Sequence, residues 1–193
     1  MIDIKIMQDA SEIIRYDSDK LPYAIQERLL SQFTERRALC HWHPDIECIR
    51  IYEGSMCYEI NGEQILLQTG DIVIVNSGQL HYGYAHDDED CKFCVELIHP
   101  DIFKTNLHIY RENVYPIIHA SGITYWLYHK EDSNYQQVAS LLDQIFDIRK
   151  IPCFVCLMDC FTVCGTAFIR AVPVNYKPLL CKRILIFPCK SKW

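Results

Sequence analysis

Short apolar runs alternate with turn-forming residues along the stretch from position 38 to position 98, at intervals of eight to twelve residues. The runs read IECIRIY, MCYEI, EQILLQ, DIVIV, HYGYAH and CKFCVELI, and the turns between them include Gly54, Asn61-Gly62 and Asn76-Ser77-Gly78. Such runs are typical of β-strands, and the Asn-Gly pair predicts a two-residue hairpin. The pattern as a whole predicts a β-sandwich or β-barrel.

The hydrophobic period changes to that of a helix between Glu131 and Arg149. Its apolar positions fall on one helical face: Val138, Leu141, Leu142, Ile145 and Phe146. Ser133 and Asn134 are candidate N-caps, and Pro152 predicts the end of the helix. This face packs either on the barrel or on a second subunit, and the pattern alone does not separate the two.

The flanking segments are less regular. Upstream, SEIIRYDSDKLPYAI predicts an extended arm, whereas ERLLSQFTERR fits a helix or a strand. Downstream, a second helix is expected over 153–169, with four cysteines on one face that we interpret as packing residues. The last 24 residues are basic and show no convincing period.

Composition narrows the class of protein. The chain has 193 residues, 50% of them hydrophobic and 23% charged, with a formal net charge of -6. This excludes global disorder and argues against DNA binding by this chain alone. No apolar run reaches the roughly 18 residues of a membrane span, and the first residues lack the apolar core of a secretion signal. We therefore expect a cytoplasmic protein without membrane contact, whose eleven cysteines are thiols.

The chemistry concentrates in the segment His41-Trp42-His43-Pro44-Asp45-Ile46-Glu47. Alternate residues of a strand face the same side, so His41 and His43 point together, and Glu47 joins them after a short kink. Two imidazoles and a carboxylate on one face form a cation site with open positions. About 35 residues later, His81 offers a fourth ligand if the sheet closes into a barrel.

These residues resemble the two signature motifs of the cupin superfamily. The first motif, H-x-H-x3-E-x6-G, matches through Gly54, and the second, which begins at Gly70, matches through Gly78 and His81 but has Asn76 where cupins often have proline. The resemblance implies a mainly β fold, the cupin double-stranded β-helix or jelly-roll barrel, followed by a small C-terminal helical segment. It also places a metal set in the barrel mouth: His41, His43, Glu47 and His81. Such a set would hold a divalent ion such as Zn, Ni, Mn or Fe, or else form a polar mouth without metal.

The amino-acid sequence around the motifs is most similar to that of the N-terminal effector-sensing domain of AraC-type transcription regulators. That family implies a small-molecule effector, often a sugar, and helices that pair two subunits into a homodimer. We expect residues 1–118 to form the barrel with its arm and residues 119–193 a helical dimerisation-like segment with an aberrant tail. Only 24 residues follow Ile169, without a helix-turn-helix pattern, so we expect truncation before the DNA-binding domain.

Two functions follow from these patterns. The first is a non-enzymatic sensor domain, and the alternative is a small metal-dependent cupin enzyme such as an isomerase or a dioxygenase. Three residues are expected to bind the ligand: Tyr52, Tyr58 and Glu96. Of these, Glu96 and Tyr58 are the candidates for the acid or base that an enzyme would need.

Overall fold

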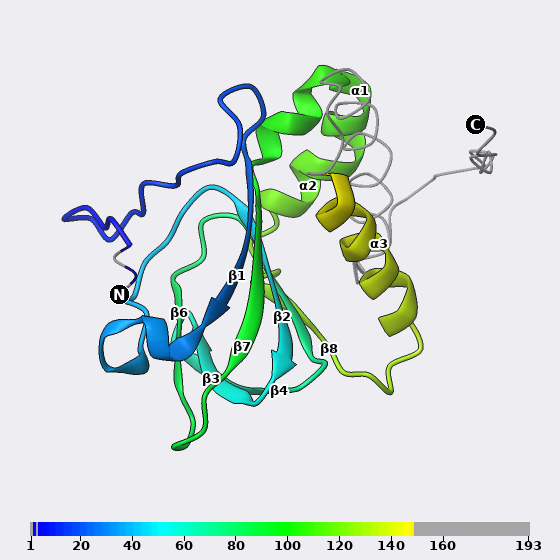
Figure 1. Cartoon of the computed structure of the whole chain (residues 1–193). Helices are drawn as coiled ribbons and strands as arrows, with labels where there is room; N and C mark the ends of the chain where they lie inside the picture. Colours follow the sequence, from blue (N-terminus) through cyan, green and yellow to red (C-terminus); the bar gives the residue numbers. More distant parts are fainter. Residues whose placement is uncertain (1, 3, 149–193) are drawn as a thin grey trace.

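The structure, a computed structural model, describes residue 2 and residues 4–148 (Figure 1). Its strands are β1 (Tyr23–Leu29), β2 (Ile46–Glu53), β3 (Ser55–Ile60), β4 (Glu63–Gln68), β5 (Ile72–Val75), β6 (His81–Ala85), β7 (Lys92–Ile98) and β8 (Tyr125–Tyr128). Its α-helices are α1 (Leu107–Ile109), α2 (Tyr115–Ile118) and α3 (Tyr135–Ile148). Short helical turns cover Leu30–Gln32, Thr34–Arg36, Pro100–Thr105 and Tyr110–Val114.

Two antiparallel sheets face each other and confirm the predicted mainly β barrel. One has the strand order β1-β7-β2-β5-β8 and the other β4-β3-β6. The predicted hairpin joins β3 and β4, because Ile60 pairs with Glu63 across Asn61 and Gly62. Both turn residues have positive φ, 50° and 85°, the twist that a two-residue hairpin requires.

Two hydrophobic cores lie on opposite faces of the larger sheet. The inner core fills the space between the sheets and includes Ile49, Ile51, Met56, Val73 and Phe93. The outer core lies between the same sheet and the helices. Because side chains alternate along a strand, one strand serves both cores. The C-x2-C pair illustrates this: Cys91, just before β7, lies in the inner core and Cys94 of β7 in the outer core, and the two form no disulfide with each other.

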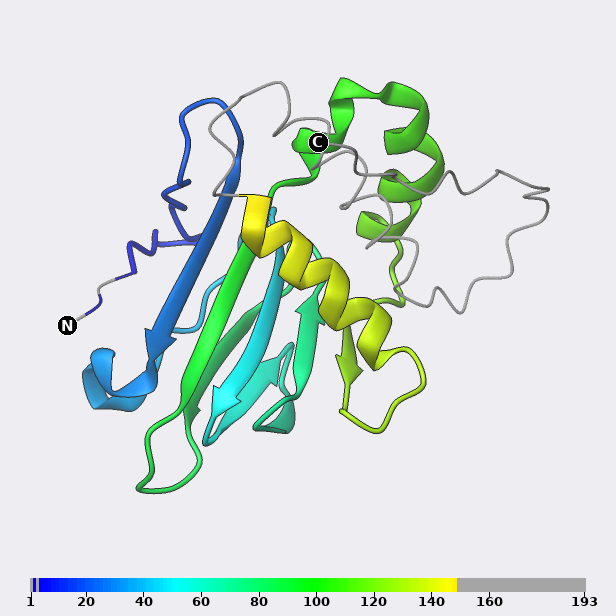
Figure 2. The same cartoon turned by 45° about the vertical axis from the view of Figure 1, so that its right-hand side comes forward.

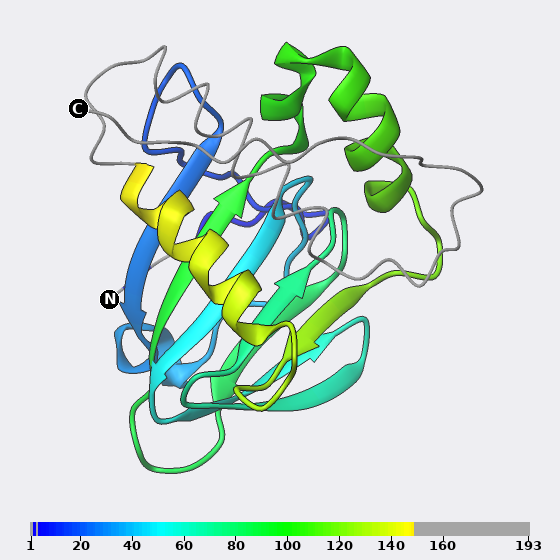
Figure 3. The same ribbon diagram turned by 90° about the vertical axis from the view of Figure 1, so that its right-hand side faces the viewer.

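Helix α3 lies across the outer face of the larger sheet, as Figures 2 and 3 show. Its apolar residues, among them Val138, Leu142 and Ile145, are fully buried in the outer core with Ile72 and Ile74 of β5. Of the two roles considered for this face, the structure therefore shows packing on the chain's own barrel. Among the described residues no helix combines the length and the apolar character needed to cross a membrane.

Strand β8 comes after the expected domain boundary at residue 118. It pairs with β5 through Ile72–Tyr128 to Val75–Tyr125, so the barrel sheet continues past that boundary. The expected second helix over 153–169, its cysteines and the basic tail lie outside the described residues.

Candidate functional site

The four predicted metal ligands come from two segments that the barrel brings together. His41 and His43 precede β2, Glu47 is the second residue of β2, and His81 is the first residue of β6. An isolated bridge joins the segments: His41 N donates to the carbonyl of His81 at 3.1 Å, and His81 N donates to the carbonyl of His41 at 2.8 Å. The barrel closure on which the fourth ligand depended is therefore present.

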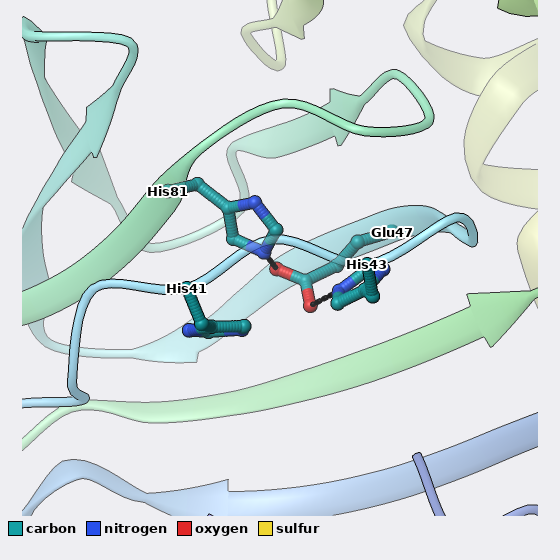
Figure 4. Close-up of side chains that lie close together, drawn as sticks. All are labelled: His41, His43, Glu47 and His81. Atoms are coloured by element: carbon teal, nitrogen blue, oxygen red, sulfur yellow. Dashed lines mark hydrogen bonds and ion pairs between the residues drawn. The ribbon is translucent and has the colours of Figure 1, made fainter. Parts of the chain in front are cut away.

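The four side chains converge in a buried cluster (Figure 4). His41 is 6% exposed, His43 1%, Glu47 5% and His81 1%. One ligand atom from each lies within 4.8 Å of the others. The two oxygens of Glu47 lie 3.4 Å from His43 Nε2 and 3.4 Å from His81 Nε2. These are the residue types and the convergence that a three-histidine, one-carboxylate cation site requires.

Backbone carbonyls orient two of the imidazoles. His41 Nδ1 lies 2.7 Å from the carbonyl of Leu39, and His81 Nδ1 lies 2.8 Å from the carbonyl of Gln79. Because a carbonyl only accepts, each Nδ1 carries the hydrogen, and each Nε2 of a neutral ring is left with its lone pair toward the cluster. His81 Nε2 is buried, and the atom that faces it is Glu47 Oε1 at 3.4 Å. This is the arrangement by which outer hydrogen bonds prepare metal-binding histidines.

The third imidazole faces a second carboxylate. His43 Nδ1 lies 3.8 Å from Asp45 Oδ2, while the other oxygen of Asp45 accepts from the hydroxyl of Tyr16 at 2.9 Å. Asp45 is 1% exposed, and burial raises its pKa although His43 and Tyr16 oppose that rise. Asp45 thus places a carboxylate beside His43 Nδ1, although the two atoms do not form a hydrogen bond.

The residues of the cluster shift one another's pKa values. Burial by itself would raise the pKa of Glu47, but the charges and hydrogen bonds of His81 and His43 hold that pKa well below its ordinary value. Burial likewise opposes protonation of His43, but Glu47 and Asp45 outweigh it, so the pKa of His43 is raised. Glu47 is therefore ionised, as a metal ligand must be.

Tyr58 approaches the cluster from β3. Its hydroxyl donates to Glu47 Oε1, and burial, followed by the charge of Glu47, raises the pKa of Tyr58 well above its ordinary value. Gly83, opposite Tyr58 on β6, provides the room. A Cβ at Gly83 would lie 2.9 Å from Met56 Sδ and 3.2 Å from Tyr58 Cδ2. A larger residue there would displace the ring that contacts Glu47.

The N-terminal arm adds a carboxylate that the sequence analysis missed. Glu12 Oε2 lies 3.1 Å from His41 Nε2. The arm is fixed beside the cluster because Glu12 N donates to the carbonyl of Trp42 and Trp42 Nε1 donates to the carbonyl of Asp9, both at 2.9 Å. Glu12 lies in a segment without periodicity, so no pattern pointed to it.

A cavity of about 620 Å³ opens beside the cluster, between the two sheets. His41, Glu47 and Tyr58 form part of its wall, and most other lining residues are apolar. Its volume is in the range of small-molecule sites. Of the three residues expected to bind the ligand, Tyr58 therefore lines the cavity.

The other two lie on the opposite face of the sheet. Tyr52 packs against the outer core, and Glu96 pairs with Ile25 and Cys48, which both belong to that core. Strand alternation is the reason: on β7 the cavity-lining Val95 and Leu97 flank Glu96, and on β2 the cavity-lining Glu47 and Ile49 lie an odd number of positions from Tyr52. The structure thus places both side chains toward the helices and away from the cavity.

Comparison with known proteins gives a family match over most of the described residues. The model of the family described as AraC-like ligand binding domain matches residues 26–149. A curated relative, the uncharacterized HTH-type transcriptional regulator YdeC of Bacillus subtilis (strain 168), is 25% identical over 151 residues. The match covers 78% of this chain and 50% of that protein, so the chain spans about half the length of this relative.

Solved structures match this chain at low sequence identity. ToxT from Vibrio cholerae O395, bound to (E)-4-(8-methylnaphthalen-1-yl)but-3-enoic acid, has a TM-score of 0.52 and 13% identity, covering 78% of this chain and 56% of that one. A Cupin 2 conserved barrel domain protein from Salinispora arenicola has a TM-score of 0.37 and 14% identity, covering 51% of this chain and 89% of that one. At these identities the likeness concerns the fold alone.

Proposed function

Because the chain belongs to the family of AraC-like ligand-binding domains, we propose that it senses a small-molecule effector for a transcription regulator of that type. The observation that carries the proposal is the cavity of about 620 Å³ inside the barrel of a matched sensor domain. The arm forms part of the wall of this cavity through Glu12 and Ile13. A ligand that contacts the arm stabilises the conformation in which the arm lies against the barrel, and binding thereby shifts the population of arm conformations.

We further propose that His41, His43, Glu47 and His81 hold a divalent ion, with Zn, Ni, Mn and Fe as the candidates. The fit rests on burial of all four side chains, on convergence of their ligand atoms within 4.8 Å, and on the backbone carbonyls that hold Nδ1 of His41 and of His81 and so turn each Nε2 toward the cluster. Nitrogen and carboxylate ligands suit these ions rather than calcium. When bound, the ion would supply a Lewis acid at the cavity wall.

Metal analysis and titration calorimetry test this part. The chelator-treated chain is titrated with Zn, Ni, Mn and Fe(II), and one site per chain is expected for at least one ion. His81→Ala should abolish that site, and His108→Ala, which changes an exposed histidine of α1, is the matched control. Equal metal affinity in the two variants would show that the ion does not bind at this cluster.

The alternative function is a metal-dependent cupin enzyme, and one observation favours it: the complete set of three histidines and one glutamate adjoins a cavity. The regulator-type matches favour the sensor. Incubation of the metal-loaded chain with bound effector separates the two. Unchanged effector after many hours supports the sensor, whereas metal-dependent conversion to product supports the enzyme.

A homodimer is part of the same proposal, drawn from the family's general organisation. The apolar face of α3 is occupied by the chain's own sheet, so a second subunit would use other surface. Sedimentation of the chain at several concentrations, with and without effector, measures the pairing. A single monomeric species at all concentrations would contradict it.

A further inference from the structure

Two polar side chains of β1 project into the barrel between apolar neighbours. In the β1–β7 pairing, Gln26 lies opposite Val95 and Arg28 lies opposite Phe93. Residues directly opposite each other in an antiparallel pair share a face. Val95 and Phe93 line the cavity, and so do Gln26 and Arg28. A guanidinium group and an amide thus belong to the interior wall of the barrel.

The charge of Arg28 is not matched by a carboxylate. Its guanidinium donates to the side-chain oxygen of Gln26, a neutral group. No acidic side chain of the described residues lies within ion-pair distance of it, in contrast to Arg50 on the outer face, which pairs with Asp143 at 2.6 Å. A guanidinium offers five N–H donors in a planar fork that fits a carboxylate. Arg28 therefore has donors free for an anion inside the cavity.

The metal cluster and Arg28 lie at different levels of the barrel. On β7, Leu97 lies opposite Glu47 of β2, and Phe93 lies opposite Arg28 of β1. Four residues of strand separate the two levels, which is about 13 Å. The wall between them carries Val95 and other aliphatic side chains. An anion held at Arg28 is thus well separated from the negative charge of Glu47.

The arm adds two more cations at the edge of the same cavity. Lys5 and Arg15 both line it and both are exposed. Neither forms an ion pair within the part of the chain that the structure describes. The acidic residue that the arm places at the cavity, Glu12, is matched by His41. These two cations at the rim favour the approach of an anion to the cavity.

We propose that the effector is a small organic anion, a carboxylate with a hydrocarbon body, whose carboxylate binds Arg28 and whose body lies along the aliphatic wall. This inference rests on the proposed sensor function and specifies its ligand class. A sugar, the effector class expected from the family resemblance, would need polar partners along its whole length, and the wall between Arg28 and the cluster offers mostly apolar side chains.

Titration calorimetry with the purified full chain tests the inference. The probes are decanoate below its micellar concentration, its neutral analogue decanamide, and the sugars L-arabinose and D-glucose. We expect decanoate to bind at about one molecule per chain and at least tenfold more tightly than decanamide or either sugar. Because a charge-assisted bidentate pair is lost, Arg28→Gln should weaken decanoate binding by roughly 10- to 100-fold.

Controls separate binding from folding. Arg111→Gln changes an exposed arginine outside the cavity lining and should bind decanoate like the unchanged chain. Arg28→Lys, which keeps the charge without the fork, should recover part of the affinity. Arg28 is only partly buried, so the circular dichroism spectrum of Arg28→Gln should match that of the unchanged chain.

The outcomes distinguish this inference from the proposed function. Binding of sugars or decanamide without a preference for decanoate overturns the inference and leaves the sensor function standing. Equal decanoate affinity in Arg28→Gln and Arg111→Gln also overturns the inference alone. Absence of saturable binding by every probe counts against both.

Discussion

Replacing Gly54 by alanine should destabilise the barrel far more than the same change at another turn. Gly54 joins β2 to β3 with φ of +77°, a conformation that costs an L-residue about 1–2 kcal/mol. A Cβ at this position would lie 2.2 Å from the carbonyl oxygen of Asp90 and 3.2 Å from Cys91 Cα. Both are backbone atoms, so no side-chain rotation relieves the contact.

Gly62 isolates the steric part of this cost. It has φ of +85°, but a Cβ there meets nothing within 4 Å. Gly62→Ala should therefore cost only the conformational penalty, about 1–2 kcal/mol. In Gly54→Ala the loop before β7 must also move by about 1 Å, a strain comparable to overpacking a core at about 1–3 kcal/mol. The expected total for Gly54→Ala is about 2–5 kcal/mol.

Urea unfolding followed by circular dichroism and by tryptophan fluorescence measures both variants. The linear extrapolation gives the free energy of unfolding, and coincidence of the two probes checks two-state behaviour. We expect a lower midpoint for Gly54→Ala than for Gly62→Ala, with unchanged slopes. Equal midpoints would refute the reasoning, because the contact with the carbonyl of Asp90 would then carry no cost.

Three further predictions concern the cluster and the helix. For both His41 and His43, burial lowers the pKa, but the hydrogen bonds and charges of acidic neighbours outweigh burial, so both pKa values are raised. Chelator competition should therefore show metal affinity falling as the pH drops from about 8 to 6, because protons compete with the metal for the ring nitrogens. A metal affinity that does not change over this pH range would contradict the prediction. Tyr58→Phe removes the hydroxyl that donates to the buried Glu47 Oε1 and should cost about 1–3 kcal/mol in urea unfolding, so a change within error would mean that water replaces the hydroxyl. Leu142→Ala should cost about 2–5 kcal/mol at every protein concentration, because α3 packs on its own sheet, whereas a concentration-dependent cost would assign that face to subunit pairing.

The barrel and its cluster of three histidines and one glutamate could be predicted because their signals are local. Turn residues separate the strands, and His41 and His43 share a face by strand alternation. Glu47 joined them across a short kink, His81 was expected if the sheet closed into a barrel, and the cupin resemblance then implied the same four residues. Glycine at position 54 also has a physical reason that the motif does not state, since any Cβ there meets the carbonyl of Asp90.

The residues that line the cavity were harder to predict, because alternation assigns a residue to a face only when the face of another residue on the same strand is known. On β2, Glu47 is the residue whose face is known. Tyr52 lies five positions after Glu47, and because this number is odd, alternation assigns Tyr52 to the opposite face. Strand β7 carries no cluster residue, so nothing in the sequence anchored Glu96. Glu12 reaches His41 from an arm whose path depends on tertiary contacts.

Strand β1 shows why the polar residues of the cavity escape sequence patterns. One face carries Tyr23 and Ile25, and the other carries Gln26 and Arg28. Alternation normally assigns the polar face to solvent and the apolar face to the core. In this barrel the apolar face packs under the helices, so the mixed face lines the cavity. In a barrel with a cavity inside and helices outside, the apolar face of a strand packs under the helices and its polar face lines the cavity. From sequence alone, the polar residues of such a cavity are therefore mistaken for solvent-exposed residues.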